Sequence, residues 1–258
     1  MNPTMPDSEA ALDTIQPDWP VGAAVRAFVT TRRGGGSVGV YGASAGGGLN
    51  LGDHVGDDAQ TVARNRARLA VAPVWLSQVH GTAVVRADAV PAGTVPVADA
   101  AYTAQPGVAC AVLTADCLPI LVADRAGRVV GAAHAGWRGL VAGVAERLIA
   151  AMRAAVPQSD LVAWLGPCIG PRAFEVGPEV RGAFMARHDG AAAAFRAGRG
   201  DRWLADLPAL ARLHLADAGV DAVSGGHWCT VEDPARFYSY RRDGLTGRFA
   251  SVIWLDQR

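Results

Sequence analysis

The feature that most constrains the fold is residues 108–139, VACAVLTADCLPILVADRAGRVVGAAHAGWRG. This stretch holds three short apolar runs, and apolar runs of this length bounded by polar breaks are typical of buried strands. They span residues 108–113, 118–122 and 129–133. We therefore expect the core of the protein to be built on this segment.

The second and third runs are separated by Asp124-Arg125-Ala126-Gly127, a composition that predicts a hairpin turn. If Asp124 lies opposite Gly127, then Cys117 lies opposite His134. Directly opposed side chains are roughly 4.5–5.5 Å apart at Cβ. This register would bring a thiol and an imidazole close enough to bind one metal ion or to hydrogen-bond to each other.

Further apolar patterns predict strands and about four helices in irregular alternation. A stripe of Leu140, Val144 and Leu148 predicts one helix that ends before Pro157, and residues 236–240 are expected to form a strand. Because hairpins mix with longer crossovers, we expect an α+β (mixed α/β) fold with mixed, largely antiparallel sheets in a layered sandwich covered by helices. Residues 1–20 are expected to be a disordered tail, and residues 21–258 a single catalytic domain.

Composition excludes several classes of function. All 24 basic residues are arginine, so a Schiff-base lysine is absent, and the formal net charge of zero provides no general attraction for nucleic acid or an anionic membrane. The four cysteines form no C-x-x-C pair, and neither a secretory signal nor an apolar run of membrane-spanning length is present. We expect a reduced, cytoplasmic protein without a membrane or nucleic-acid partner. The oligomeric state stays open.

Two chemical interpretations share the same residues. His80, at the end of another short predicted strand, could join Cys117 and His134 as a third metal ligand, and three protein ligands leave one position for water or substrate. Alternatively, Cys117 is a nucleophile and His134 its base, with Asp116 or Gln78 orienting the imidazole. Two histidines and a cysteine also resemble an electron-transfer copper site. A multicopper oxidase is disfavoured, because such an enzyme needs many histidines, several as H-x-H pairs, and the chain has six histidines and no H-x-H pair.

Candidate substrate residues lie near these positions. Arg138 precedes a predicted helix N-terminus, where backbone donors and a guanidinium together would suit phosphate. Three arginines lie on a predicted helix that ends near residue 70, and Arg66 is the one expected to point into a site. Other candidates for lining the pocket are Arg32, Asn50 and Gln78.

Several blocks of the sequence resemble the YfiH-type family, whose members are called laccase-domain proteins, peptidoglycan editing factors or multi-activity purine nucleoside phosphorylases. The resemblance covers nearly the whole chain after the first twenty residues. The blocks are TTR from Thr30, LNLG from Leu49, HVGDD from His54, QVHG from Gln78, TADCLP from Thr114, HAGWRG from His134, WLGP from Trp164 and FYSYRRDG from Phe237.

The resemblance implies that His80, Cys117 and His134 bind zinc. It also implies phosphorolysis of adenosine, inosine, guanosine and 5′-methylthioadenosine, together with deamination of adenosine. The H-x-E proton shuttle of zinc base deaminases is absent, so Asp116 or an unassigned glutamate would have to move the protons. Two alternatives are a metal-free Cys–His hydrolase or amidase acting on peptidoglycan precursors, and a binding module in which zinc only holds loops together.

Overall fold

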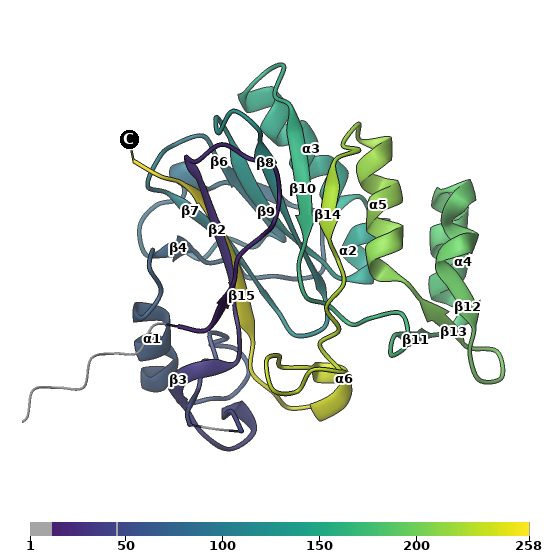
Figure 1. Cartoon of the computed structure of the whole chain (residues 1–258), viewed down its shortest axis with the longest axis horizontal. Coiled ribbons are helices and arrows are strands. Elements are labelled where there is room, and N and C mark those ends of the chain that lie inside the picture. Colours follow the sequence, from purple (N-terminus) through teal and green to yellow (C-terminus); the bar gives the residue numbers. More distant parts are fainter. Residues whose placement is uncertain (1–11, 45, 258) are drawn as a thin grey trace, which may run out of the picture.

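The computed structural model describes residues 12–44 and 46–257. Two β-sheets pack face to face, and helices cover the outer face of the larger sheet (Figure 1). Most neighbouring strands are antiparallel. The parallel pairs are β10 (Leu161–Leu165) with β14 (Val223–Gly225), β4 (Pro73–Val74) with β7 (Ala109–Thr114), and β5 (Val84–Arg86) with β6 (Ala100–Thr103). The expectation of mixed, largely antiparallel sheets in an α+β sandwich is confirmed.

The sheets have the following composition. The five-stranded sheet has the order β1-β2-β15-β7-β4, with bounds Thr14–Ile15, Val25–Thr30, Phe249–Leu255, Ala109–Thr114 and Pro73–Val74. The six-stranded sheet has the order β14-β10-β8-β9-β6-β5, with bounds Val223–Gly225, Leu161–Leu165, Leu118–Asp124, Val130–Ala135, Ala100–Thr103 and Val84–Arg86. A small sheet has the order β11-β13-β12, with bounds Glu175–Val176, Trp203–Ala205 and Phe195–Ala197, and β3 is Arg33–Ser37.

Six α-helices and three short 3-10 helices lie in the described part of the chain. The α-helices α1 to α6 are Ala59–Ala67, Trp137–Val141, Val144–Ala155, Pro178–Arg187, Leu207–Asp217 and Tyr240–Asp243. The 3-10 helices η1 to η3 are Gly39–Tyr41, Ala87–Ala89 and Asp189–Ala194. Among these described helices, none has the length and apolar character needed to cross a bilayer.

Alternating side chains divide each central strand between two cores, as the pleat of a strand requires. In β8, Leu121 and Ala123 pack between the two sheets, whereas Ile120 and Val122 pack against the helices. Each of these side chains is 0–1% exposed. Full burial of one such large aliphatic side chain contributes about 1.5–3 kcal/mol, so the sandwich rigidly fixes the ends of its strands.

The predicted hairpin forms, but its register differs from the expected one. Pro119, not Cys117, pairs with His134, because the turn spans residues 125–128 between Asp124 and Val129. Asp124 stabilises this wider turn by accepting hydrogen bonds from the Arg128 side chain. The shift is two residues, an even number, so Cys117 and His134 stay on the same face.

Three other local predictions are wrong in detail. The single helix expected from Leu140 is two helices, α2 and α3, because Gly143 adopts a φ of 96° between them. Residues 236–239 do not form a strand, and Tyr240 begins α6. Thr14–Ile15 pairs with β2 inside the segment expected to be a disordered tail, while residues 1–11 lie outside the described residues. A single domain over residues 21–258 stays a prediction.

Candidate metal and substrate site

The site lies where the two sheets end at one edge of the sandwich. Strands β7 and β9 end at this edge, and β8 and β15 begin there. The short loop from Thr114 to Leu118 crosses from one sheet to the other and carries Asp116 and Cys117. Strand β9 presents His134 on the face that looks toward the other sheet, so the loop and the strand bring a thiol and an imidazole together.

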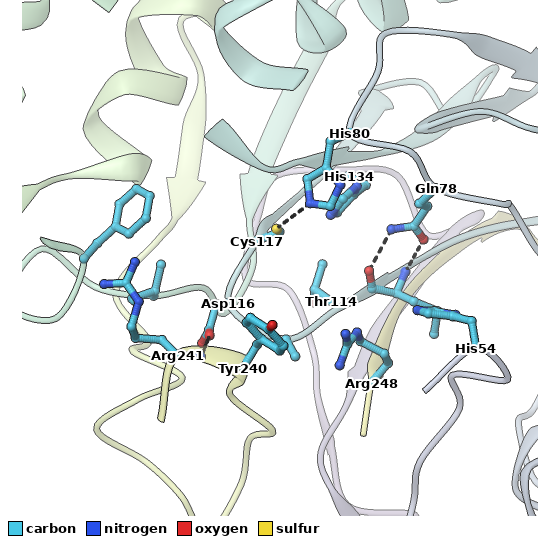
Figure 2. A pocket seen from close by; sticks show the side chains of 14 residues that line it. His54, Gln78, His80, Thr114, Asp116, Cys117, His134, Tyr240, Arg241 and Arg248 are labelled. Carbon is cyan, nitrogen blue, oxygen red and sulfur yellow. Dashed lines mark hydrogen bonds between the residues drawn. The ribbon is translucent and has the colours of Figure 1, made fainter. Parts of the chain in front are cut away.

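His80, Cys117 and His134 form a compact group of donors (Figure 2). Their ligand atoms all lie within 4.8 Å of one another, and His80 Nε2 is 3.6 Å from Cys117 Sγ. The two imidazole rings meet edge to face with centroids 4.7 Å apart. Zinc–nitrogen and zinc–sulfur bonds of about 2.0–2.3 Å require donor atoms at roughly this spacing. This donor set therefore suits a metal ion, as the sequence predicted.

Gly136 leaves the space that the three donors require. A Cβ atom at this position would lie 2.6 Å from His80 Cδ2 and 3.0 Å from Cys117 Sγ. Real Cβ atoms do not approach other heavy atoms so closely, so any side chain here would displace His80 or Cys117. The absence of a side chain at residue 136 is thus a condition for the cluster.

Asp99 positions both histidines from behind. Its carboxylate is fully buried, and Oδ1 lies 2.8 Å from His134 Nδ1 while also accepting the backbone N–H of His80 at 2.9 Å. Oδ2 accepts the backbone N–H of Gly81 at 2.7 Å. A carboxylate on one ring nitrogen leaves the other, Nε2 of His134, to face a metal or the thiol. Sequence reasoning missed Asp99, although an acidic residue within an apolar run is a signal of a buried, partnered charge.

Two backbone conformations at the site are strained. His80 has a φ of 60° and Asp116 a φ of 94°, values that non-glycine residues rarely adopt. Asp116 is held by hydrogen bonds to both of its carboxylate oxygens, from the Thr230 hydroxyl and from the backbone N–H of Arg241 at 2.6 Å. Asp116 thus lies at the cavity as expected, and its carboxylate anchors the loop before Cys117.

Electrostatics favour an ionised Cys117 in the metal-free group. Burial raises the pKa of its thiol, but the neighbouring His134 and His80 outweigh this effect and lower it to about 6. Burial lowers the pKa of His134, but Cys117 and Asp99 raise it to about 9. A thiolate is a metal ligand as well as a nucleophile, and in the second case His134 is the base that has taken its proton. The electrostatics are therefore compatible with both interpretations of the sequence.

A cavity of about 340 Å³ opens in front of the three donors, near the lower end of the range for small-molecule sites. It is lined by His54, Gln78, His80, Leu113, Thr114, Ala115, Asp116, Cys117, His134, Ile169, Phe174, Tyr240, Arg241 and Arg248. Gln78 is fixed there by two 2.8 Å hydrogen bonds to the backbone of Leu113. Of the residues predicted to bind substrate or phosphate, Gln78 is the one that lines this cavity.

The other predicted substrate residues have partners elsewhere. Arg138 is exposed and stacks over the Trp137 ring at 4.5 Å. Arg32 donates to the carbonyl of Gly42, and Arg66 pairs with Asp53 at 3.2 Å. Asn50 is buried behind the cavity wall, where its Oδ1 accepts the backbone N–H of Arg248 at 2.8 Å.

Instead, the cavity receives side chains from the C-terminal part of the chain. Helix α6 contributes Tyr240 and Arg241, and the residue before β15 is Arg248 (Figure 2). Sequence reasoning missed all three because they lie more than 100 residues from Cys117. The block FYSYRRDG, singled out for its resemblance, was the available signal for the first two.

Comparisons with known proteins cover almost the whole chain. Residues 26–256 match the family described as multi-copper polyphenol oxidoreductase laccase. A protein of Pseudomonas aeruginosa named purine nucleoside phosphorylase is 53% identical over 246 residues, which cover 93% of this chain and 98% of that protein. The purine nucleoside phosphorylase YfiH of Escherichia coli is 50% identical over 247 residues, with the same two coverages.

Solved structures are similar as well. The crystal structure of the Neisseria meningitidis protein NMB0706 superimposes with a TM-score of 0.88 at 49% identity, covering 95% of this chain and 99% of that one. YlmD from Geobacillus stearothermophilus superimposes with a TM-score of 0.82 at 32% identity, covering 91% and 93%.

Proposed function

The chain belongs to the multi-copper polyphenol oxidoreductase laccase family, the YfiH type that its sequence resembles, and on that premise we propose that it is a metal-dependent purine nucleoside phosphorylase. The names of its relatives support the general activity. The finer proposal is a zinc enzyme that accepts adenosine, inosine, guanosine and 5′-methylthioadenosine and also deaminates adenosine.

The observation that carries the proposal is a three-donor group facing a cavity. His80, Cys117 and His134 would hold zinc, and the cavity side would keep its fourth position accessible. When bound, the ion would supply Lewis-acid polarisation and an activated water. Copper is disfavoured because an axial methionine is missing from the described group: Met152 is buried in the helix-side core and Met185 lies exposed on α4.

Phosphorolysis also places demands on the chain itself. A phosphate oxygen must form a bond to C1′ of the ribose while the bond from C1′ to the base nitrogen breaks, and the base leaves with the electron pair and takes up a proton. Guanidinium groups of Arg241 and Arg248 provide positive charge for phosphate in the cavity. Phe174 and Tyr240 offer aromatic faces on which a purine can stack.

Deamination requires a group that moves protons. Among the described residues that line the cavity, Asp116 is the carboxylate available, but both of its oxygens already accept hydrogen bonds. We therefore expect deamination to be slower than phosphorolysis, because these two hydrogen bonds hold the Asp116 carboxylate in place and it is not free to reorient toward a substrate.

The decisive experiment is incubation of the purified protein with inosine or adenosine and phosphate, followed by chromatography of free base and ribose 1-phosphate. Cys117→Ala should abolish the release of base, whereas Cys229→Ala, which changes a thiol outside the group, should retain it. Base release by the wild type that does not exceed that of Cys117→Ala would refute the proposal.

A second candidate is the Cys–His hydrolase or amidase that acts on peptidoglycan precursors. The lowered thiol pKa and the Asp99–His134 contact give a Cys–His–Asp arrangement that supports it. Elemental analysis separates the two candidates, since stoichiometric zinc that is lost in Cys117→Ala supports the phosphorylase. A zinc site closed by a fourth protein ligand would instead support a binding module. In each case we propose a small-molecule ligand in the cytoplasm, without a nucleic-acid or membrane partner.

A further inference from the structure

Arg248 is a half-buried cation without a carboxylate partner in the part of the chain that the structure describes. Its Nη1 donates to the carbonyls of Thr246 and Gly247 at 3.1 and 3.0 Å, and its backbone is fixed by Asn50. Burial lowers the pKa of Arg248, while the nearby Cys117 and Asp116 raise it. Removing a guanidinium from water without a counter-ion is unfavourable, and an anion bound beside Arg248 would offset this cost.

Thr114 provides a second, independent indication at the same place. Its side chain lines the cavity, the residue is only 1% exposed, and Oγ1 has no hydrogen-bond partner among the described residues. Thr114 pairs with Phe249 across β7 and β15, which places it beside Arg248. In Figure 2 Thr114 is drawn between Arg248 and the group of His80, Cys117 and His134. A buried hydroxyl without a partner costs about 1–3 kcal/mol, which a ligand oxygen would offset.

We propose that Arg248 and Thr114 form the phosphate-binding site of the reaction, in the part of the cavity that Arg248 lines. This inference rests on the proposed phosphorylase function and replaces the expectation that Arg138 binds phosphate. The guanidinium would donate through its unused N–H groups and Thr114 through its hydroxyl to different oxygens of one phosphate. The nucleoside would then lie between phosphate and metal, with C1′ facing Arg248.

The test is calorimetric titration of zinc-loaded protein with inorganic phosphate, with and without inosine, using sulfate as a second oxyanion. Arg248→Gln should weaken phosphate binding about 10- to 100-fold, since a hydrogen bond to a charged group is lost. Thr114→Val should weaken it roughly 3- to 10-fold, as expected for one neutral hydrogen bond. In steady-state assays the KM for phosphate should rise by the same factors, while the KM for inosine stays unchanged.

Matched controls distinguish this role from a structural one. Arg138→Gln changes an exposed arginine outside the cavity, and Ser251→Ala removes another buried hydroxyl without a partner among the described residues, on β15. Both should bind phosphate like the wild type. Because Thr114→Val also removes an unpartnered hydroxyl, its melting temperature should not fall below that of the wild type.

The outcomes separate this site from the proposed function. If Arg248→Gln and Thr114→Val bind phosphate as tightly as the wild type, or if the wild type does not bind it, the assignment is wrong. If both variants still release base and their KM for phosphate is unchanged, the proposed phosphorylase reaction is supported and the assignment of Arg248 and Thr114 to phosphate binding is refuted. If phosphate binds through Arg248 but the wild type releases no base, the phosphate site is supported and the proposed phosphorylase reaction is refuted.

Discussion

Gly136→Ala is the sharpest test of the metal cluster. The backbone of Gly136 has φ −61° and ψ 157°, which alanine adopts without strain. A Gly→Ala change at such a position normally stabilises a fold by about 0.4–1 kcal/mol. Here the new methyl group would lie 2.6 Å from His80 Cδ2 and 3.3 Å from His80 Nε2. Since His80 lies on an exposed loop, its ring should swing away and withdraw one of three ligands.

We expect the affinity of Gly136→Ala for zinc to fall by at least 100-fold, because even a change behind a ligand costs 10–100-fold. The melting temperature of the metal-free protein should stay within a few degrees of the wild type. Competition with a chromogenic chelator measures the affinity, and the thiolate-to-metal absorption of the cobalt-substituted protein reports on Cys117. Gly182→Ala, where a methyl group meets nothing within 4 Å, is the matched control. Wild-type affinity in Gly136→Ala would refute the proposed position of the ion.

Further predictions concern the carboxylates and the thiol. Asp99→Asn should lower the free energy of unfolding by about 1–3 kcal/mol and zinc affinity about 10- to 100-fold; Asp124→Asn, the same change at a buried carboxylate in the β8–β9 turn, should reduce stability but not zinc affinity. Alkylation of Cys117 in metal-free protein, followed by mass spectrometry, should accelerate as the pH rises through about 6 rather than near 9, and bound zinc should suppress it. The lowered pKa of Cys117 stabilises the metal-free fold at high pH, and this stabilisation is lost as the pH falls through about 6. The raised pKa of His134 stabilises the fold below about pH 6.5, and this stabilisation is lost as the pH rises through about 9. The melting temperatures of the wild type and Cys117→Ser should therefore differ most between about pH 6 and pH 9, where the thiolate and the imidazolium are present together. Equal differences in melting temperature at pH 5 and pH 7.5 would contradict the pKa values.

The fold class and the proximity of Cys117 and His134 were predictable from the sequence, because both follow from apolar periodicity and turn composition, which are local signals. The exact pairing was two residues off, since Arg125–Arg128 forms a wider turn than the composition of Asp124–Gly127 suggested. The error did not matter for the cluster, because the two residues stayed on one face.

The wall of the cavity was much less predictable. The positions of Arg32, Arg66 and Arg138 in the sequence made them plausible substrate-binding residues. Long arginine side chains, however, bind to nearby carbonyls, carboxylates and aromatic rings, and these three do so outside the cavity. Arg248 reaches the site only because β15 lies next to β7, a contact between residues far apart in the sequence. The role of Asp99 likewise depends on the approach of the consecutive backbone amides of Val79, His80 and Gly81, about twenty residues earlier in the chain.

The pairing of β8 with β9 has a consequence for how the chain folds in the presence of metal. A slip of one residue would turn His134 toward the helices while Cys117 stayed behind, and the donors would separate. An ion bound by both therefore stabilises the native alignment relative to one shifted by a single residue. Zinc that is present while the chain folds should therefore increase the fraction of molecules with the native pairing of β8 and β9 relative to molecules with a shifted pairing.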